Sequence, residues 1–325
     1  MDALFWGAGC SFAVVALLGP LAIPLLHRLK FGQVVREDGP AAHKAKTGTP
    51  TMGGLLMLAG ICIAVLLVHA SSPVAWLMLF MTLACGALGF VDDYIKVVLK
   101  RNLGLRAKEK LLGQILIALV FSWIVTRYMG RGTDLWIPGL GISWDIGFLF
   151  HVLVFFIIVG TTNAVNLTDG LDGLAAGTTA VAMGIYAAAA WFLGQADVAG
   201  FFAVVSGAAL GFLLFNRHPA RIFMGDTGSL ALGGALAAGA VLTRTELVLP
   251  VIGAVFVAEA LSVILQVASF KSTGRRIFRM SPLHHHFELG GWSETRVVHV
   301  FWFAGIVSGL VGLWMVMGST GGRLI

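Results

Sequence analysis

The sequence predicts an all-α, polytopic integral membrane protein with about ten transmembrane helices. Of its 325 residues, 58% are hydrophobic and only 12% are charged, whereas soluble globular domains carry roughly 25% charged residues. Apolar runs close to the length that crosses about 30 Å of hydrocarbon recur along the chain. The 42 glycines agree with this class, because small residues let helices in lipid approach closely. The composition disfavours a large soluble helical protein.

The apolar runs define the predicted spans in order. Pro20 and Pro24 fall in the first span, where neighbouring helices can satisfy the carbonyl groups that a proline frees. The eighth span is short and rich in glycine, and a small hairpin is predicted at 132–145. No fixed-period repeat or low-complexity linker divides the chain, so residues 1–325 are predicted to form a single transmembrane domain. The spans cover residues 3–26, 53–70, 74–91, 111–129, 146–164, 175–194, 199–215, 229–243, 248–270 and 297–317.

The basic residues predict the orientation of the chain. With the first connection in the cytoplasm, 18 of the 22 Lys and Arg residues lie on that side, as is typical of cytoplasmic loops. Both termini are then expected outside. The basic face suits anionic membrane lipids, while nothing in it resembles a nucleic-acid-binding module, so no nucleic acid partner is expected. The predicted cytoplasmic connections are 27–52, 92–110, 165–174, 216–228 and 271–296.

Aspartates gather at the same predicted cytoplasmic mouth. Asp92 and Asp93 end the third span, Asp169 and Asp172 follow the fifth, and Asp226 precedes the eighth. Carboxylates this close to hydrocarbon are costly, so function is the default interpretation. A single aspartate often caps a helix or lies in a solvated loop, but three clusters on one side indicate a hard cation held by oxygen ligands. Mg²⁺ fits, because it typically takes one or two carboxylates, waters and substrate phosphates.

Lysines and a glycine-rich turn accompany these aspartates. Residues 225–229 form a predicted tight turn whose backbone N–H groups can meet an anion. Lys96 lies one turn beyond Asp92 if that helix continues, and neighbouring connections carry Lys46, Lys108 and Lys110. Phosphoryl transfer needs positive charge and accurate positioning more than covalent chemistry from the protein. The pattern therefore predicts a site for phosphoryl transfer.

Three consecutive histidines, His284, His285 and His286, occupy the fifth cytoplasmic connection. They lack the HExxH spacing and the cysteine partners of a zinc site. Their imidazoles can instead contact phosphate or sugar oxygens, and a polar loop without a ligand is the alternative. Glu259, inside the ninth span, is either a hydrogen-bonded residue of the bundle or part of a cleft wall.

Five motifs together resemble one enzyme family, and they follow its order along essentially the whole chain. They are similar to those of phospho-N-acetylmuramoyl-pentapeptide transferases, the translocases of peptidoglycan synthesis. The aspartate motifs are shared with the wider superfamily that transfers N-acetylhexosamine phosphates to polyprenyl phosphate, whereas the first motif and the histidines are typical of the muramoyl-pentapeptide branch. The motifs are KTGTPTMGG (46–54), VDDY (91–94), NAVNLTDGLDG (163–173), FMGDTGS (223–229) and SPLHHHFE (281–288).

The resemblance implies a homodimeric enzyme of the bacterial inner membrane with ten transmembrane helices and a cytoplasmic active site. The implied reaction joins UDP-MurNAc-pentapeptide to undecaprenyl phosphate, giving lipid I and UMP, with Mg²⁺ as the cofactor. By the same resemblance, Asp226 would ligate Mg²⁺, while Asp92 and Asp93 would bind or activate the lipid phosphate and join the metal ligands. The three histidines would help to hold the diphosphate or sugar.

The resemblance also implies a nucleotide-sugar site. Asn216, Phe223 and Gln266 would lie near the uridine, with Phe223 able to stack on uracil. Lys108 and Lys110 are both candidates for a functional lysine of their connection. The substrate-binding residues implied in this way are Thr51, Asn163, Asn166, Asp169, Asp172, Asn216, Phe223, Gly225, Ser229 and Gln266.

Two mechanisms and two other functions remain open at this point. A lipid phosphate oxygen attacks the sugar-linked phosphorus directly, or an aspartyl phosphate forms first. Asp92 or Asp93 is the candidate base, although a phosphate dianion scarcely needs one. The nearest alternative function is a related transferase that uses UDP-GlcNAc. A transporter or flippase would carry ionisable groups at mid-membrane and internal repeats, whereas here the acidic residues gather at one surface.

Overall fold

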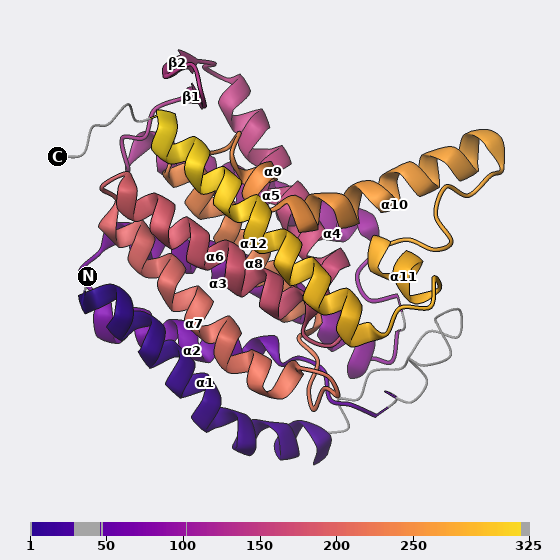
Figure 1. Cartoon of the computed structure of the whole chain (residues 1–325). Helices are drawn as coiled ribbons and strands as arrows, with labels where there is room; N and C mark the ends of the chain where they lie inside the picture. The colour runs from indigo at the N-terminus through magenta and orange to yellow at the C-terminus, as the bar shows by residue number, and fades with distance from the viewer. Residues whose placement is uncertain (1, 29–45, 47, 102, 320–325) are drawn as a thin grey trace.

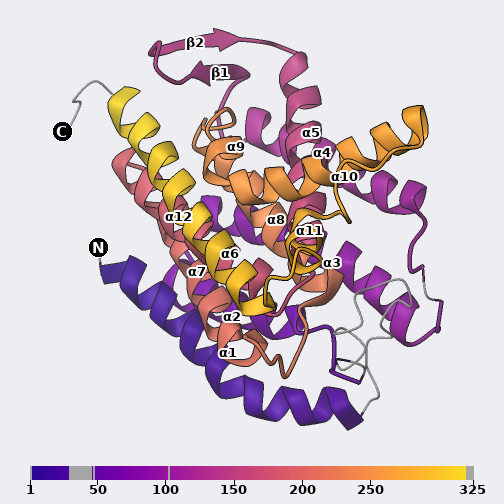
Figure 2. The same cartoon turned by 45° about the vertical axis from the view of Figure 1, so that its right-hand side comes forward.

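The computed structural model describes residues 2–28, 46, 48–101 and 103–319, and its long helices lie side by side in one bundle from which α10 projects (Figures 1 and 2). A two-stranded hairpin stands at one end of the bundle. The elements in chain order are α1 (Asp2–Arg28), α2 (Gly54–Val68), α3 (Pro73–Val97), α4 (Ala107–Arg127), β1 (Asp134–Ile137), β2 (Ile142–Asp145), α5 (Leu149–Thr168), α6 (Leu174–Phe192), α7 (Ala196–Asn216), α8 (Gly225–Leu242), α9 (Leu249–Ile252), α10 (Ala254–Thr273), α11 (Leu283–Glu288) and α12 (Glu294–Ser319).

The predicted fold class is confirmed. Within the described residues, eight helices are long and apolar enough to cross a membrane, and α2 and α8 occupy the other two predicted spans. Several predicted boundaries are wrong: α4 begins at Ala107 rather than at 111, and α5 continues to Thr168 rather than ending at 164. The third helix continues to Val97 and so carries Asp92 and Asp93 inside it, and α8 begins at Gly225 rather than at 229. The ninth span is broken at Gly253, which separates α9 from α10.

Helix α8 forms the centre of the bundle, and every residue from 227 to 242 is buried. Its neighbours approach it through glycines. A Cβ added at Gly89 of α3 would lie 2.1 Å from the backbone oxygen of Asp226, and one at Gly54 of α2 would lie 2.2 Å from the backbone nitrogen of Gly228. Because small residues permit such backbone contact, α2 and α3 pack directly on the first turn of α8.

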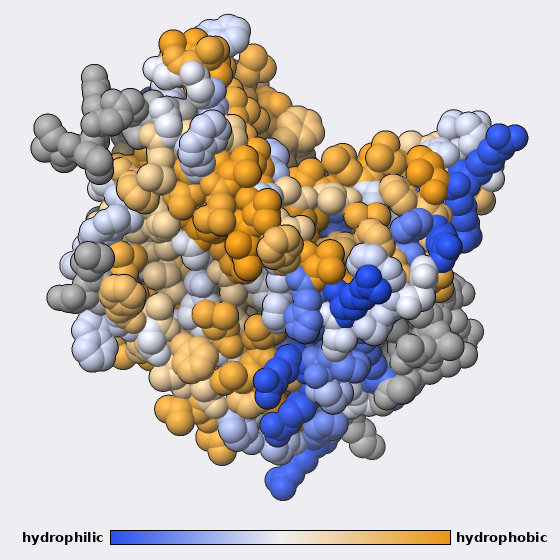
Figure 3. All heavy atoms as spheres, viewed as in Figure 1, coloured by the Kyte–Doolittle hydropathy of each residue, from blue (hydrophilic) through white to orange (hydrophobic). Residues whose placement is uncertain are grey.

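The connections lie at two opposite ends of the bundle. Hydrogen bonds bring together, at one end, segments of all five connections that the sequence places in the cytoplasm; residues 29–45 and 47 of the first lie outside the described residues. Helix α1 begins and α12 ends at the other end (Figure 1). Figure 3 shows hydrophilic residues gathered at the first end and at the tip of α10, with a hydrophobic surface between the two ends.

The predicted hairpin forms at the other end, where β1 and β2 pair antiparallel. Arg131, just before β1, is 5% exposed. It bonds Glu246 and the backbone oxygen of Val241, and its guanidinium lies 4.5 Å from the centre of the Phe150 ring. Because a buried charge is costly unless it is paired, these contacts fasten the hairpin to the loop after α8.

Candidate active site

Three aspartates from two helices meet at the end of the bundle that gathers the five connections. Asp92 and Asp93 lie in the last turns of α3, and Asp226 lies in the first turn of α8. One carboxylate oxygen of each lies within 4.8 Å of the others. Asp92 and Asp93 are 2% and 4% exposed. This group, the aspartate triad, is therefore a largely buried concentration of oxygen ligands of the kind that Mg²⁺ binds.

Asp93 also caps the start of α8, whose first backbone N–H groups have no partners inside the helix. Its carboxylate accepts hydrogen bonds from the backbone nitrogen atoms of Asp226 (3.1 Å) and Thr227 (2.8 Å), and from the Thr227 hydroxyl (2.6 Å). Gly225 has a φ of +74°, and a Cβ there would lie 2.6 Å from Asp93 Oδ2. The turn therefore requires glycine, and Asp93 fixes the position of Asp226.

Two lysines face the triad. Lys96 pairs with Asp92 one helical turn away, and its Nζ lies 3.3 Å from Asp226 Oδ2. Lys110 Nζ lies 2.9 Å from the same oxygen. Lys108 is exposed, so Lys110 is the lysine of that connection that the structure brings to the triad. When all three carboxylates are ionised, the two ammonium groups leave one negative charge in excess, which favours a further cation.

The last turn of α5 and the loop after it approach the triad from another side. Asn166 Nδ2 donates to Asp226 Oδ1 (3.0 Å) and to Ser229 Oγ (2.8 Å). Asp169 accepts a hydrogen bond from the backbone N–H of Gly225. Burial, together with the carboxylates of the triad, raises the pKa of Asp169 to about 8. The loop therefore adds a fourth carboxyl group, one with a raised pKa, beside the triad.

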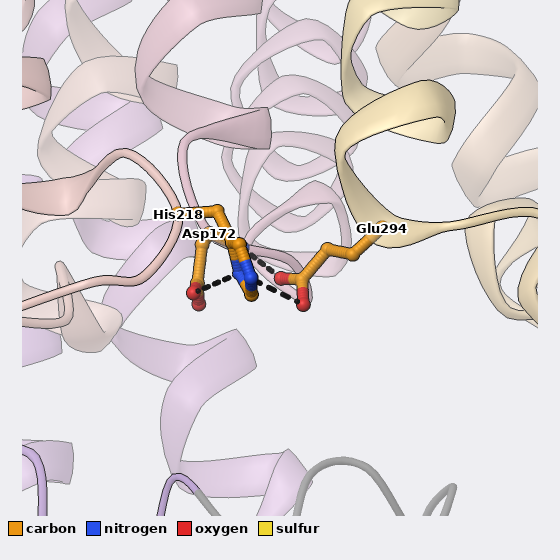
Figure 4. A group of neighbouring side chains, drawn as sticks. All are labelled: Asp172, His218 and Glu294. Atoms are coloured by element: carbon orange, nitrogen blue, oxygen red, sulfur yellow. Dashed lines mark hydrogen bonds and ion pairs between the residues drawn. The ribbon is translucent and has the colours of Figure 1, made fainter.

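A second polar group is drawn in Figure 4. Asp172 from the loop between α5 and α6, His218 from the loop after α7 and Glu294 from the start of α12 place ligand atoms within 4.8 Å of one another. Lys46 Nζ lies 2.7 Å from Asp172 Oδ1 and 2.6 Å from Glu294 Oε1. The ammonium thus brings to the two carboxylates the positive charge that a metal ion would bring. We name these four residues the Lys46 cluster.

Two residues expected near the uridine hold loops in place. Asn216 Oδ1 accepts a hydrogen bond from the backbone nitrogen of Gly173 (3.0 Å), and its Nδ2 donates to the backbone oxygen of Ile222 (2.9 Å). Gln266 Oε1 accepts from the backbone nitrogen atoms of residues 277 and 278, both at 2.9 Å. Each side chain therefore orders the backbone beside it.

Phe223 and Thr51 come from segments that pair through their backbones. The nitrogen of Phe223 donates to the oxygen of Pro50, and the nitrogen of Gly53 donates to the oxygen of Phe223, both at 2.8 Å. Asn163 lies on α5, and its Nδ2 donates to Gln114 Oε1 on α4 at 3.3 Å. Gln114 is a buried polar residue within an apolar helix, a signal from which its pairing with α5 could have been suspected.

The three histidines lie in the short helix α11, within the connection between α10 and α12. His284 is buried, and its Nδ1 lies 3.1 Å from Glu259 Oε1. His285 Nδ1 lies 2.8 Å from a carboxylate one turn on. His286 Nδ1 accepts a hydrogen bond from the backbone nitrogen of Arg279, which leaves the ring proton on Nε2. Glu259 is thus a hydrogen-bonded residue of the bundle, and it orients His284.

Gly170→Ala is expected to destabilise the protein. A Cβ at this position would lie 2.2 Å from His284 Nε2, and the imidazole has no room to retreat because it is buried and held by Glu259. Overpacking of this kind typically costs about 1–3 kcal/mol. Thermal unfolding in detergent should show a lower midpoint, whereas Gly9→Ala, where a Cβ meets nothing within 4 Å, should leave it unchanged. Equal midpoints for both variants would contradict the packing described here.

Comparison with known proteins places the chain among named relatives. A family model described as glycosyl transferase family 4 matches residues 75–244. Relatives from Heliobacterium modesticaldum, Geobacillus thermodenitrificans and Bacillus subtilis, each named phospho-N-acetylmuramoyl-pentapeptide-transferase, are 57%, 57% and 56% identical to the chain. The alignments cover 98%, 94% and 94% of the chain, and 99%, 95% and 95% of those proteins. The similarity therefore extends over nearly the full length of each.

Proposed function

Because the chain belongs to the phospho-N-acetylmuramoyl-pentapeptide transferases, within glycosyl transferase family 4, we infer that it transfers phospho-MurNAc-pentapeptide from UDP-MurNAc-pentapeptide to undecaprenyl phosphate. The products are lipid I and UMP. The chain is accordingly a membrane phosphoglycosyl transferase of peptidoglycan synthesis. Identity above one half along nearly the whole chain supports this assignment.

We propose that the aspartate triad binds Mg²⁺, and the convergence of three carboxylates from two helices is the observation that carries this proposal. Asp92 and Asp226 are the preferred ligands. Asp93 is held by two backbone N–H groups and a buried hydroxyl of α8, whereas the lysines that face Asp226 are flexible side chains that can move when a cation binds. Mg²⁺ bound there supplies positive charge to the diphosphate of the nucleotide sugar. In this proposal Asp93 acts by holding α8 in place.

The proposed chemistry is a direct displacement. An oxygen of the lipid phosphate forms a bond to the sugar-linked phosphorus while the bond from that phosphorus to UMP breaks. Lys96 and Lys110 lie beside Asp226, where their charges offset the negative charge that grows on the departing UMP. The attacking phosphate is already an anion, so it requires no strong base from Asp92.

A two-step route through an aspartyl phosphate is the competing mechanism. UDP-MurNAc-pentapeptide labelled at the sugar-linked phosphate distinguishes the two. Direct displacement predicts no label on the protein when undecaprenyl phosphate is withheld, and a trapped phospho-enzyme would favour the two-step route.

We place the nucleotide sugar across the segment 163–173, which spans the end of α5 and the loop after it, and the Lys46 cluster. The half-buried ring of Phe223 offers a planar face on which uracil can stack. His286 carries its proton on Nε2, which makes that atom a donor for a sugar or diphosphate oxygen. These positions put the diphosphate between the Lys46 cluster and the triad in the proposal.

We propose that the active end of the bundle faces the cytoplasm of a bacterial cell, with both termini on the outer side of the inner membrane. Its connections hold 18 of the 22 Lys and Arg residues, as cytoplasmic loops typically do. This orientation gives a water-soluble nucleotide donor access to the site. The resemblance to the family supports a homodimer, with membrane lipids as its surroundings.

Release of UMP by the purified protein tests the proposed function. The expected result is release from UDP-MurNAc-pentapeptide that requires both undecaprenyl phosphate and Mg²⁺, with little release from UDP-GlcNAc. Preference for UDP-GlcNAc would assign the chain to a related transferase. Release that is independent of the lipid phosphate would refute group transfer to it.

A further inference from the structure

Glu294 joins three separate segments with one carboxylate. Its Oε1 accepts hydrogen bonds from Lys46 Nζ at 2.6 Å and from the backbone nitrogen of Asp172 at 2.7 Å, and its Oε2 lies 3.4 Å from His218 Nδ1. Lys46 and Asp172 are 248 and 122 residues away along the chain. Because Glu294 begins α12, it ties these segments to one of the long helices of the bundle (Figure 4).

Lys46 needs a second carboxylate, besides that of Asp172, to fix the position of its ammonium group. Asp172 Oδ2 accepts hydrogen bonds from His218 Nδ1 and from the backbone nitrogen of Ala220, both at 3.0 Å, so Oδ1 is the oxygen that meets Lys46. A lysine ammonium on its flexible stem can rotate about a single partner. The second carboxylate, from Glu294, restricts it to one position between the two acids.

Glu294 also orders the loop that carries Asp172. Asp172 is only 4% exposed, and a buried backbone N–H group needs a hydrogen-bond partner. Glu294 accepts that hydrogen bond from Asp172. The next residue, Gly173, donates to Asn216 and accepts from Trp302 of α12. Helix α12 thus bonds both Asp172 and Gly173, the first through Glu294 and the second through Trp302.

We propose that Glu294 is a positioning residue for the nucleotide-sugar donor: it holds Lys46 and the Asp172 loop in the geometry that binds the donor. The inference rests on the proposed function, in which Lys46 and Asp172 belong to the donor site. The described contacts of Glu294 stay within the Lys46 cluster and do not include the aspartate triad. Its loss therefore weakens donor binding and leaves the chemical step largely intact.

Steady-state kinetics of Glu294→Ala test this role. The KM for UDP-MurNAc-pentapeptide should rise about 10- to 100-fold, the range expected when hydrogen bonds to a charged group are lost. The kcat and the KM for undecaprenyl phosphate should change less than about 3-fold, as expected when ground-state binding alone is lost. Glu294→Gln keeps an oxygen for both donors, so it should recover much of the lost donor affinity.

Asp197→Ala is the matched control, because Asp197 is also an acidic residue in the first turn of a long helix. It lies at the opposite end of the bundle, beside His69, and should leave both KM values unchanged. Thermal unfolding midpoints check that each variant is folded, and Glu294→Gln carries the kinetic test if the alanine variant is not.

A double-mutant cycle with Lys46→Ala shows whether Glu294 acts through the lysine. The two substitutions together should raise the donor KM much less than the product of their separate effects, as residues in one network do. Three results would overturn the role of Glu294. They are a double variant whose donor KM rises by the full product of the two separate effects, a fall in kcat alone, and an unchanged donor KM. Wild-type protein that releases no UMP from UDP-MurNAc-pentapeptide would instead refute the proposed function, and this inference with it.

Discussion

Asp226→Asn is expected to lower kcat about 1,000-fold or more, since it removes both a metal ligand and the charge that organises the site. Asparagine has nearly the same shape, and its oxygen can still accept the hydrogen bond from Asn166. Its amide group, however, would replace the oxygen that now faces Lys96 and Lys110. The two ammonium groups would then meet a donor in place of an acceptor, and the triad would lose one of its three carboxylates.

UMP release at saturating concentrations of both substrates measures this effect. Asp197→Asn, an equivalent change on an exposed carboxylate at the opposite end of the bundle, should retain the wild-type rate. Thermal unfolding should show that Asp226→Asn is folded. A folded Asp226→Asn protein with normal Mg²⁺-dependent turnover would contradict the assignment of Asp226.

Gly89→Ala is expected to reduce kcat/KM about 100-fold, the loss that follows when catalytic groups move by about 1 Å. The added Cβ would lie 2.1 Å from the backbone oxygen of Asp226 and 2.7 Å from the backbone nitrogen of Thr227. Backbone atoms cannot rotate away as a side chain can, so α3 and the first turn of α8 must separate. This separation also stretches the hydrogen bonds with which Asp93 holds α8.

The matched control is Gly160→Ala on α5, where a Cβ meets nothing within 4 Å and activity should be unchanged. The same UMP-release assay serves both variants. If Gly89→Ala retained the activity of Gly160→Ala, then contact between the backbones of α3 and α8 would not set the position of Asp226.

The transmembrane part of the fold was predictable because apolar length is a strong signal in lipid. Each of the ten predicted spans corresponds to a described helix, with the ninth divided in two. The boundary errors have two different causes. Hydropathy falls where Asp92 and Asp93 appear, yet the backbone hydrogen bonds of α3 continue to Val97, because side-chain polarity alone does not end a helix. The break between α9 and α10 falls at a single glycine, Gly253, within an unbroken apolar run.

The candidate site was predictable where residue types alone carry the signal. Aspartates beside apolar spans are costly enough to stand out, and the structure brings Asp92, Asp93 and Asp226 together. Lys108 and Lys110 were indistinguishable in sequence, but two positions along a helix point in different directions. Only Lys110 of this pair is found against Asp226.

The partners of the Lys46 cluster were not predictable from a single sequence. Glu294 and His218 lie in no recognised motif, and their neighbours are brought to them from distant parts of the chain by the packing of α6, α7 and α12. Glu259 stood out as a carboxylate inside an apolar span, but its contact with His284 depends on how α11 folds back onto α10. Contacts of this kind are set by tertiary structure and leave no local pattern.

Binding of Mn²⁺ to the purified protein, measured by electron paramagnetic resonance, tests the central claim most directly: that the aspartate triad holds a divalent cation. One bound ion per chain is expected in the wild type and in Glu294→Gln, and Asp92→Asn and Asp226→Asn should lose it. Retention of the ion in both aspartate variants would contradict this claim. Loss of the ion in Glu294→Gln would contradict it too, because it would indicate a metal site outside the triad.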